Sequence, residues 1–282
     1  MIIAIASGKG GTGKTTIATN LAMVLSKQGR QVELLDCDVE EPNCHIFVNP
    51  VIESGGPITI PVPQIDKDKC NFCGVCREVC QYNAIVCLKD NVMIFDDMCH
   101  GCGGCERFCP EKAITETGKE IGQVEIGKAK GFRFVQGKLN IGQVMAPAVI
   151  REVKAAAGES EITIIDAPPG TSCPVIEGIK DADYVILATE PTPFGLNDLK
   201  LAVEMARALN LRFEVVINRC DSGDEGVKQY CAMEGIPVML EIPDDRRVAE
   251  AYSRGKIVSE CLEGYANMFS RLAERITDGV TT

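Results

Sequence analysis

The chain of 282 residues has little of what a nucleic-acid-binding surface uses. It contains no Trp, aromatic residues make up 5% of it, and its formal net charge is −11. Proteins that hold nucleic acids combine basic surfaces with aromatic side chains that stack on the bases. Both features are scarce here, so we expect no nucleic-acid partner.

Long hydrophobic runs are also missing. No apolar run approaches the ~18 residues of a membrane-spanning helix. The first residues, MIIAIASGKGG, lack the basic start and the long apolar centre of a secretory signal. The last residues, from Arg275 to Thr282, do not form a basic amphipathic anchor. We expect a cytoplasmic protein with no stable membrane association.

What is present is a regular alternation of short apolar runs and amphipathic stretches. It predicts an α/β fold, a mostly parallel sheet covered by helices on both faces. The predicted strands are Ile2–Ala6, Val32–Asp36, Ile162–Asp166, Tyr184–Ala188, Phe213–Asn218 and Val238–Ile242. The predicted helices are Lys14–Lys27, Ala148–Ala157, Pro174–Lys180, Leu196–Leu209, Gly226–Glu234, Asp245–Arg254 and Tyr265–Ile276.

Cysteine interrupts this pattern. Nine of the fifteen cysteines lie between Cys70 and Cys109, and a motif repeats there: DKCNFCGVCREVC, from Asp68, returns 29 residues later as DMCHGCGGCERFC. Disulfides are rare in the cytoplasm, so the cysteines indicate metal binding. We predict that residues 57–118 are an inserted small α+β module, entered through a proline-rich linker at residues 57–63. Residues 1–56 and 119–282 would form the main domain.

A glycine-rich loop follows the first predicted strand and opens the first predicted helix. Its sequence, GKGGTGKT from Gly8 to Thr15, is that of a phosphate-binding P-loop. Lys14 is expected to reach the β- and γ-phosphates and the Thr15 hydroxyl to ligate Mg²⁺. The residues predicted to contact the nucleotide here are Gly8, Gly10, Gly11, Thr12, Gly13, Lys14, Thr15 and Thr16.

Lys9, a second lysine near the start of the loop, makes it resemble the deviant Walker A motif of the MinD/ParA/Mrp and nitrogenase iron-protein group. The resemblance implies a P-loop NTPase fold and a Mg²⁺-dependent ATPase. It also implies that Lys9 acts on the ATP of a partner subunit. The expected assembly is a homodimer or a dimer with a homologous ATPase.

Further segments resemble that group in the same order along the chain. The segment LLDCD ends the second strand, and the resemblance implies that its second acid, Asp38, positions the attacking water, while Asp36 belongs to the Mg²⁺ site. The segment IIDAPPG is similar to a Walker B strand whose acid, Asp166, holds Mg²⁺ through water.

The base of the nucleotide has its own expected contacts. Asn218, in VINR, is similar to the family's adenine-reading Asn, and Pro243 and Asp244 are expected beside the base. The four matching segments together span about 220 residues outside the insert.

The two cysteine ladders have the spacing of bacterial ferredoxins with two [4Fe–4S] clusters, in which the fourth Cys of each ladder ligates the other cluster. The first set is therefore Cys70, Cys73, Cys76 and Cys109, and the second is Cys80, Cys99, Cys102 and Cys105. Structural zinc is the alternative. Cys173, seven residues after Asp166, is at the offset of a cluster ligand in the nitrogenase iron protein; the remaining cysteines are expected to be buried core residues.

These features favour an ATPase that couples nucleotide-dependent dimerisation to electron transfer or to metal-cluster maturation. The alternative is an iron–sulfur cluster carrier or scaffold with an ATP-driven release switch. A MinD-like positioning ATPase ranks below both, because the chain end lacks a membrane anchor. The expected cofactors are ATP, Mg²⁺ and two [4Fe–4S] clusters, and the sequence does not identify the redox partner or client protein.

Overall fold

The structure is a computed structural model that describes residues 1–279. In that range a nine-stranded sheet has the order β11-β10-β9-β1-β8-β2-β7-β6-β3. The strands are β1 (Ile2–Ser7), β2 (Val32–Asp36), β3 (Val51–Ile65), β6 (Ile114–Ala129), β7 (Phe132–Leu139), β8 (Ile162–Pro169), β9 (Tyr184–Thr189), β10 (Phe213–Asn218) and β11 (Val238–Ile242). Strands β11 to β7 in this order run parallel, whereas β6 pairs antiparallel with both of its neighbours, β7 and β3.

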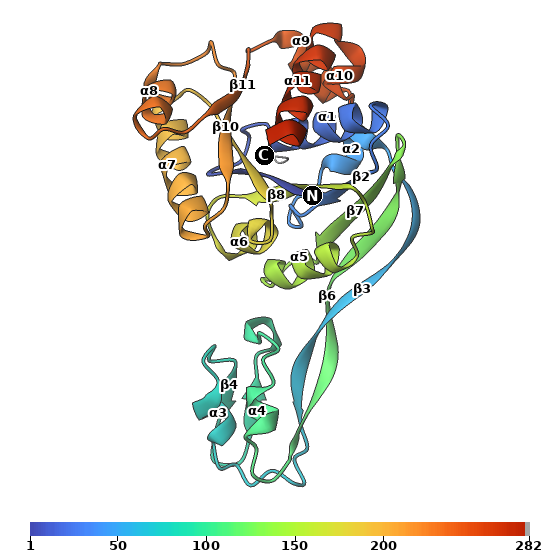
Figure 1. The fold of residues 1–282 in the computed structure, drawn as a ribbon. Helices are drawn as coiled ribbons and strands as arrows, with labels where there is room; N and C mark the ends of the chain where they lie inside the picture. Colours follow the sequence, from blue (N-terminus) through green and yellow to red (C-terminus); the bar gives the residue numbers. More distant parts are fainter. Residues whose placement is uncertain (280–282) are drawn as a thin grey trace.

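Helices cover the two faces of the sheet (Figure 1). One face carries α1 (Lys14–Lys27), α2 (Cys44–Val48), α9 (Arg246–Ser253), α10 (Val258–Cys261) and α11 (Glu263–Gly279). The other carries α5 (Ala146–Ala155), α6 (Cys173–Ile179), α7 (Pro193–Ala208) and α8 (Gly226–Met233). The predicted architecture, a mostly parallel sheet with helices on both faces, is confirmed.

The alternation within β1 shows why its sequence is apolar throughout. Ile3 and Ile5 belong to the core on the α1 side, and Ala4 and Ala6 belong to the core on the α5–α7 side, all fully buried. Successive side chains of a strand point to opposite faces, so a strand between two helical layers has no polar face. Burial on both faces therefore accounts for the continuous apolar run.

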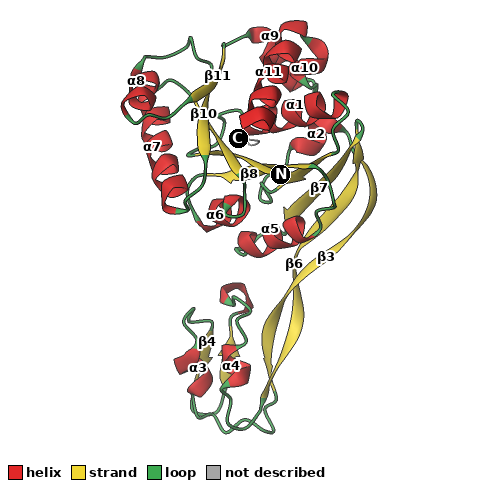
Figure 2. Ribbon diagram, in the orientation of Figure 1, coloured by secondary structure: helices red, strands yellow, loops and turns green. Residues whose placement is uncertain are grey.

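Strands β3 and β6 leave the sheet edge as a long two-stranded ribbon (Figure 2). Ile65 pairs with Ile114 at the far end, and residues 66–113 lie between them. The prolines predicted to form a linker lie inside β3 instead. That prediction was wrong because β3 is an edge strand, where a proline need not donate to a neighbour.

The segment beyond the ribbon is small. It contains α3 (Val75–Val79), β4 (Ile85–Cys87), β5 (Val92–Ile94), η1 (Asp96–Met98) and α4 (Gly104–Arg107). Its buried core consists of Cys76, Ile85, Cys105 and Ile114. So small a core indicates that the segment needs ligands to hold its shape. No helix within residues 1–279 is long and apolar enough to cross a membrane.

Candidate functional site

The glycine-rich loop joins β1 to α1 with a backbone that requires glycine. Gly11 and Gly13 have φ angles of +80° and +93°, in the left-handed region that glycine favours. A Cβ atom on Gly13 would lie 2.5 Å from Asn218 Nδ2. Asn218 donates a hydrogen bond to the carbonyl oxygen of Thr12 over 3.0 Å. The end of β10 therefore braces the loop where it turns into α1.

Lys14 is the first residue of α1, directly after the glycines of the loop, and only 6% of its surface is exposed. Burial lowers the pKa of its ammonium group, and the carboxylates of Asp166 and Asp38 act in the opposite direction. A buried cation needs anions close by. Lys14 therefore lies in a site that suits a negatively charged phosphate as well as these two carboxylates.

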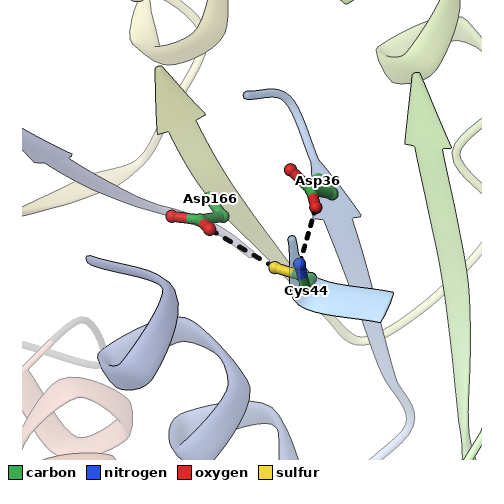
Figure 3. Close-up of side chains that lie close together, drawn as sticks. All are labelled: Asp36, Cys44 and Asp166. Carbon is green, nitrogen blue, oxygen red and sulfur yellow. Dashed lines mark hydrogen bonds between the residues drawn. The ribbon is translucent and has the colours of Figure 1, made fainter. Parts of the chain in front are cut away.

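Two buried carboxylates, those of Asp36 and Asp166, lie on either side of Cys44 (Figure 3). Asp166 Oδ2 accepts hydrogen bonds from the Thr15 hydroxyl (2.7 Å) and the Cys44 thiol (3.3 Å). Asp36 Oδ2 accepts from the backbone N–H groups of Asn43 (3.0 Å) and Cys44 (2.9 Å). The ligand atoms of Asp36, Cys44 and Asp166 lie within 4.8 Å of one another.

Burial and mutual repulsion disfavour charge on this pair. Burial, reinforced by Asp166, raises the pKa of Asp36 to about 8, and burial also raises the pKa of Asp166. Asp166 Oδ1 is buried without a hydrogen-bond partner. An unpartnered carboxylate oxygen beside the Thr15 hydroxyl fits the oxygen-rich shell that Mg²⁺ prefers. Thr15 and Asp166 can therefore hold Mg²⁺, and the carboxyl group of Asp36 lies within 4.8 Å of that of Asp166.

Asp38 lies at the junction of two clefts. One, of about 440 Å³, is lined by the loop, and the other, of about 540 Å³, runs between Asp38 and the residues around Ser172. Burial is the first cause that raises the pKa of Asp38 to about 6, and Asp166 adds to it. Its carboxyl group is therefore placed where a water molecule beside the terminal phosphate could be oriented.

The cleft lined by the loop collects most of the residues predicted to contact the nucleotide. These are Gly10, Gly11, Gly13, Lys14, Thr15, Thr16, Asp38, Asn218, Pro243 and Asp244. Gly8 and Thr12 lie outside its lining, and the buried Thr12 hydroxyl has no hydrogen-bond partner. The aromatic residues Tyr252, Tyr265 and Phe269 also line it. The sequence analysis missed these three, because only the packing of α9 and α11 brings them to the cleft.

Lys9 is not among the residues that line this cleft, and it pairs with an acidic residue that the sequence did not reveal. Its Nζ lies 3.6 Å from Glu190 Oε2, and Arg219 Nη1 lies 3.0 Å from Glu190 Oε1. Glu190 follows β9 and its side chain is only 12% exposed. One acid therefore holds two cations at the edge of the phosphate loop.

The eight ladder cysteines line two separate cavities. Residues lining the first include Cys70, Cys73, Cys76 and Cys109. Residues lining the second include Cys80, Cys99, Cys102 and Cys105. Each cavity thus receives three cysteines from one ladder and the fourth from the other, which is the grouping expected from the spacing.

The ladder sulfurs do not stand close together. A tetrahedral zinc with ~2.3 Å bonds needs sulfurs about 3.8 Å apart. Among the described residues, no three of the ladder sulfurs lie within 4.8 Å of one another.

The other cysteines divide between the core and the surface. Cys37, Cys44 and Cys231 are buried, as predicted. Cys261 is exposed, and Cys87 and Cys220 are half-buried, so the expectation of core burial was wrong for these three. Cys261 is the last residue of α10, Cys87 is the last residue of β4, and Cys220 lies two residues after β10. Cys173 is exposed at the start of α6.

The sequence is similar to a family of nucleotide-binding proteins and to several of its relatives. The family described as the CobQ/CobB/MinD/ParA nucleotide binding domain matches residues 3–258. An uncharacterised protein of Methanocaldococcus jannaschii is 32% identical over 260 residues, covering 91% of this chain and 90% of that protein. The iron-sulfur cluster carrier protein of Pyrococcus horikoshii is 26% identical over 298 residues, covering 98% and 85%.

A solved structure agrees with the fold. The septum site-determining protein MinD of Pyrococcus horikoshii, in complex with Mg-ADP, superposes with a TM-score of 0.62 at 20% identity. The match covers 98% of this chain and 95% of that one. The likeness concerns the arrangement of the sheet and its helices.

Proposed function

The chain belongs to the CobQ/CobB/MinD/ParA nucleotide-binding family, and on this premise we propose that it is a Mg²⁺-dependent ATPase that carries iron–sulfur clusters and releases them in response to ATP. The observation that carries the proposal is the pair of four-cysteine cavities in the same chain as a phosphate loop. Relatives named iron-sulfur cluster carrier proteins support it.

The nucleotide is proposed to lie along the cleft that the phosphate loop lines. Lys14 binds its β- and γ-phosphates, and Asn218, Pro243 and Asp244 contact the base. Thr15 and Asp166 hold Mg²⁺, which neutralises the charge that develops on the phosphates when it is bound. Asp38 orients the attacking water with its carboxylate.

ATP is proposed to act by joining two subunits. A ligand shifts a two-state equilibrium only through contacts that differ between the states. Lys9 suits that role, because it lies at the edge of the loop in an ion pair it can leave. Binding of Lys9 to the partner's phosphates would exchange Glu190 for a stronger anion. The dimer partner is a second copy of the chain or a homologous ATPase.

The clusters are proposed to be two [4Fe–4S] groups in residues 57–118. Cys70, Cys73, Cys76 and Cys109 would hold one, and Cys80, Cys99, Cys102 and Cys105 the other. One supporting observation is that each cavity is lined by three cysteines of one ladder and the fourth of the other. Another is that, in the described part of the chain, no three ladder sulfurs lie within 4.8 Å of one another. Iron–sulfur clusters are held by such thiolates.

Electron transfer is the second candidate function. It is favoured by the two cavities lying together in one small segment, each drawing a cysteine from the ladder of the other. Adjacent clusters of this kind pass electrons in ferredoxin-type proteins. The two functions differ in whether the clusters leave the protein.

The test uses the full chain, reconstituted with iron and sulfide in the absence of air. We expect MgATP to shift the chain toward a dimer and to accelerate the loss of cluster iron to bathophenanthroline, a chelator of ferrous iron that leaves Mg²⁺ in place, with the sulfide released into solution. Lys9→Ala should abolish both effects while MgATP still binds. Lys128→Ala, which removes an exposed lysine of the ribbon, is the control and should behave as wild type.

Two results would decide against the carrier function. If the clusters stay bound in the presence of MgATP and can be reversibly reduced, the result favours electron transfer over the carrier function. A colourless chain that retains zinc and shows no response to nucleotide would contradict both functions.

A further inference from the structure

The two cysteine cavities are related by the sequence repeat but differ in how they are covered. The repeat offset of 29 residues relates Asn71 to His100 and Glu111 to Tyr82. Asn71 and Glu111 line the first cavity, and Tyr82 and His100 line the second. Equivalent positions of the two halves therefore stand at equivalent places on the two cavities.

These equivalent pairs make different contacts. At the first cavity, Asn71 Nδ2 donates a hydrogen bond of 3.0 Å to Glu111 Oε1, and both side chains are exposed. At the second, the rings of Tyr82 and His100 are stacked, with centroids 3.7 Å apart and an interplanar angle of 10°, and both side chains are exposed here as well. An exposed polar hydrogen bond competes with water, whereas a stacked pair also removes apolar surface from water. The Tyr82–His100 contact is therefore the more stable of the two exposed pairs.

A second pair of equivalent positions differs in the same direction. Phe72 and Gly101 have similar left-handed backbones, with φ angles of +58° and +62°. A Cβ on Gly101 would lie 3.0 Å from the carbonyl oxygen of Pro61, so this turn lies against the backbone of β3. At the first cavity the side chain of Phe72 takes part in the lining instead. A side chain on a surface turn is a movable cover, and a strand backbone is a fixed one.

The second cavity also adjoins the main domain. Cys99 packs against the core cluster that contains Val39 and Val149. Just before it, Asp97 forms an ion pair of 2.6 Å with Lys119 of β6, and its pKa is lowered chiefly by this lysine and further by Gln143 of the loop before α5. The cysteines of the first cavity are not part of that core cluster. Of the eight ladder cysteines, all within the described residues, Cys99 is thus the one that packs against this cluster, which includes Ile60 and Val62 of β3.

Resting on the proposed function, we propose that the two sites differ in role. The site of Cys70, Cys73, Cys76 and Cys109 is the exchange site, through which an iron–sulfur cluster enters and leaves past Phe72 and the Asn71–Glu111 pair. The site of Cys80, Cys99, Cys102 and Cys105 retains its cluster behind the Tyr82–His100 stack.

The repeat allows the covers to be exchanged. Asn71→His with Glu111→Tyr places the aromatic pair on the first site, and His100→Asn with Tyr82→Glu places the polar pair on the second. Each double variant is the matched control of the other. Phe72→Gly removes the movable cover alone and leaves a residue that suits a positive φ angle.

The measurement is the loss of cluster absorption when EDTA is added to the reconstituted full chain without air. We expect two phases of equal amplitude in the wild type. The graft on the first site should slow only the fast phase, roughly three- to tenfold. The reverse graft should accelerate only the slow phase, and Phe72→Gly should accelerate the fast one.

A single phase in a wild-type chain that holds both clusters would overturn the inference, and so would two grafts that act on the same phase. If a graft loses its clusters, Phe72→Gly decides: an unchanged fast phase contradicts the exchange site. A wild-type chain that binds no iron at the ladders would instead refute the proposed function itself.

Discussion

At the scale of single residues, the buried carboxyl groups of Asp36 and Asp166 dominate the chemistry of the nucleotide site. Each is fully buried, and each holds its neighbours through short hydrogen bonds. When no cation is bound, ionising both carboxyl groups is unfavourable, because like charges repel strongly in a site without water. Asp166 accepts from two side-chain donors, so Asp36 is the member expected to keep a proton.

The nucleotide-free chain should consequently lose stability as the pH rises. The pKa of Asp36 is raised from 3.8 to about 8, so between these values the folded state holds a proton that the unfolded state releases. The free energy of unfolding should then fall as the pH rises through this window. Urea unfolding at a series of pH values measures it.

Asp36→Asn is the control for this titration. Its amide oxygen can still accept the backbone hydrogen bonds, but it does not titrate. The slope of stability against pH should therefore be smaller than in the wild type. An equal slope in both proteins would place the titrating group elsewhere.

Glu190 should oppose dimerisation by holding Lys9. Glu190→Gln removes the ion pair but keeps the side-chain shape. Partly exposed pairs contribute up to about 1 kcal/mol, so the ATP concentration needed for half-maximal dimerisation should fall roughly two- to fivefold. Analytical ultracentrifugation with increasing MgATP would show this. Glu234→Gln, which breaks the exposed pair with Arg207, should leave the midpoint unchanged.

At the scale of elements, α5 lies close to the sheet because two glycines face it. A Cβ on Gly137 of β7 would lie 2.6 Å from Val153 Cγ2, and one on Gly122 of β6 would lie 3.1 Å from Val149 Cγ2. The N-terminal residue of α5, Ala146, lines the same cleft as Asp38. The packing of α5 on these glycines therefore sets one wall of that cleft.

Gly137→Val should move α5 away from the sheet and destabilise the chain by about 1–3 kcal/mol, the usual effect of overfilling a packed contact. Chemical denaturation followed by circular dichroism measures the loss. Gly56→Val is the matched control, since no atom lies within 4 Å of a Cβ at that strand position. Equal losses in the two variants would show that α5 is not held in this way.

At the scale of the whole molecule, the β3–β6 ribbon separates the cysteine segment from the nucleotide cleft (Figure 1). The boundaries predicted at residues 57 and 118 both fall inside these strands. The ribbon itself belongs to the main sheet through the pairing of β6 with β7. A functional boundary is therefore better placed where Ile65 faces Ile114.

Replacing residues 66–113 by an Asn-Gly turn should leave the nucleotide site intact. Ile65 and Ile114 are directly paired, and Asn-Gly closes an antiparallel pair with a two-residue turn. The shortened chain should bind MgATP with wild-type affinity but no iron, as checked by calorimetry and iron analysis. Loss of nucleotide binding in a folded product would show that the cysteine segment helps to build the cleft.

The sequence by itself determined the elements whose cause is local. The bounds of α1, β2, β10 and β11 agree with prediction, because apolar runs and the glycine loop mark them directly. The distribution of the ladder cysteines between two cavities also agrees with the grouping predicted from their spacing.

The tertiary structure alone decided what depends on contacts between distant residues. Strands β3 and β6 were missed because a partly exposed antiparallel ribbon rich in Gly and Pro has no continuous apolar run. Strand β7 was missed because Arg133, Gln136 and Lys138 interrupt its apolar residues. Cys44 reaches Asp166 across 122 positions, and Lys9 meets Glu190 only because β1 and β9 are neighbours. Composition and spacing carry no information about such pairs, because the register of the sheet brings them together.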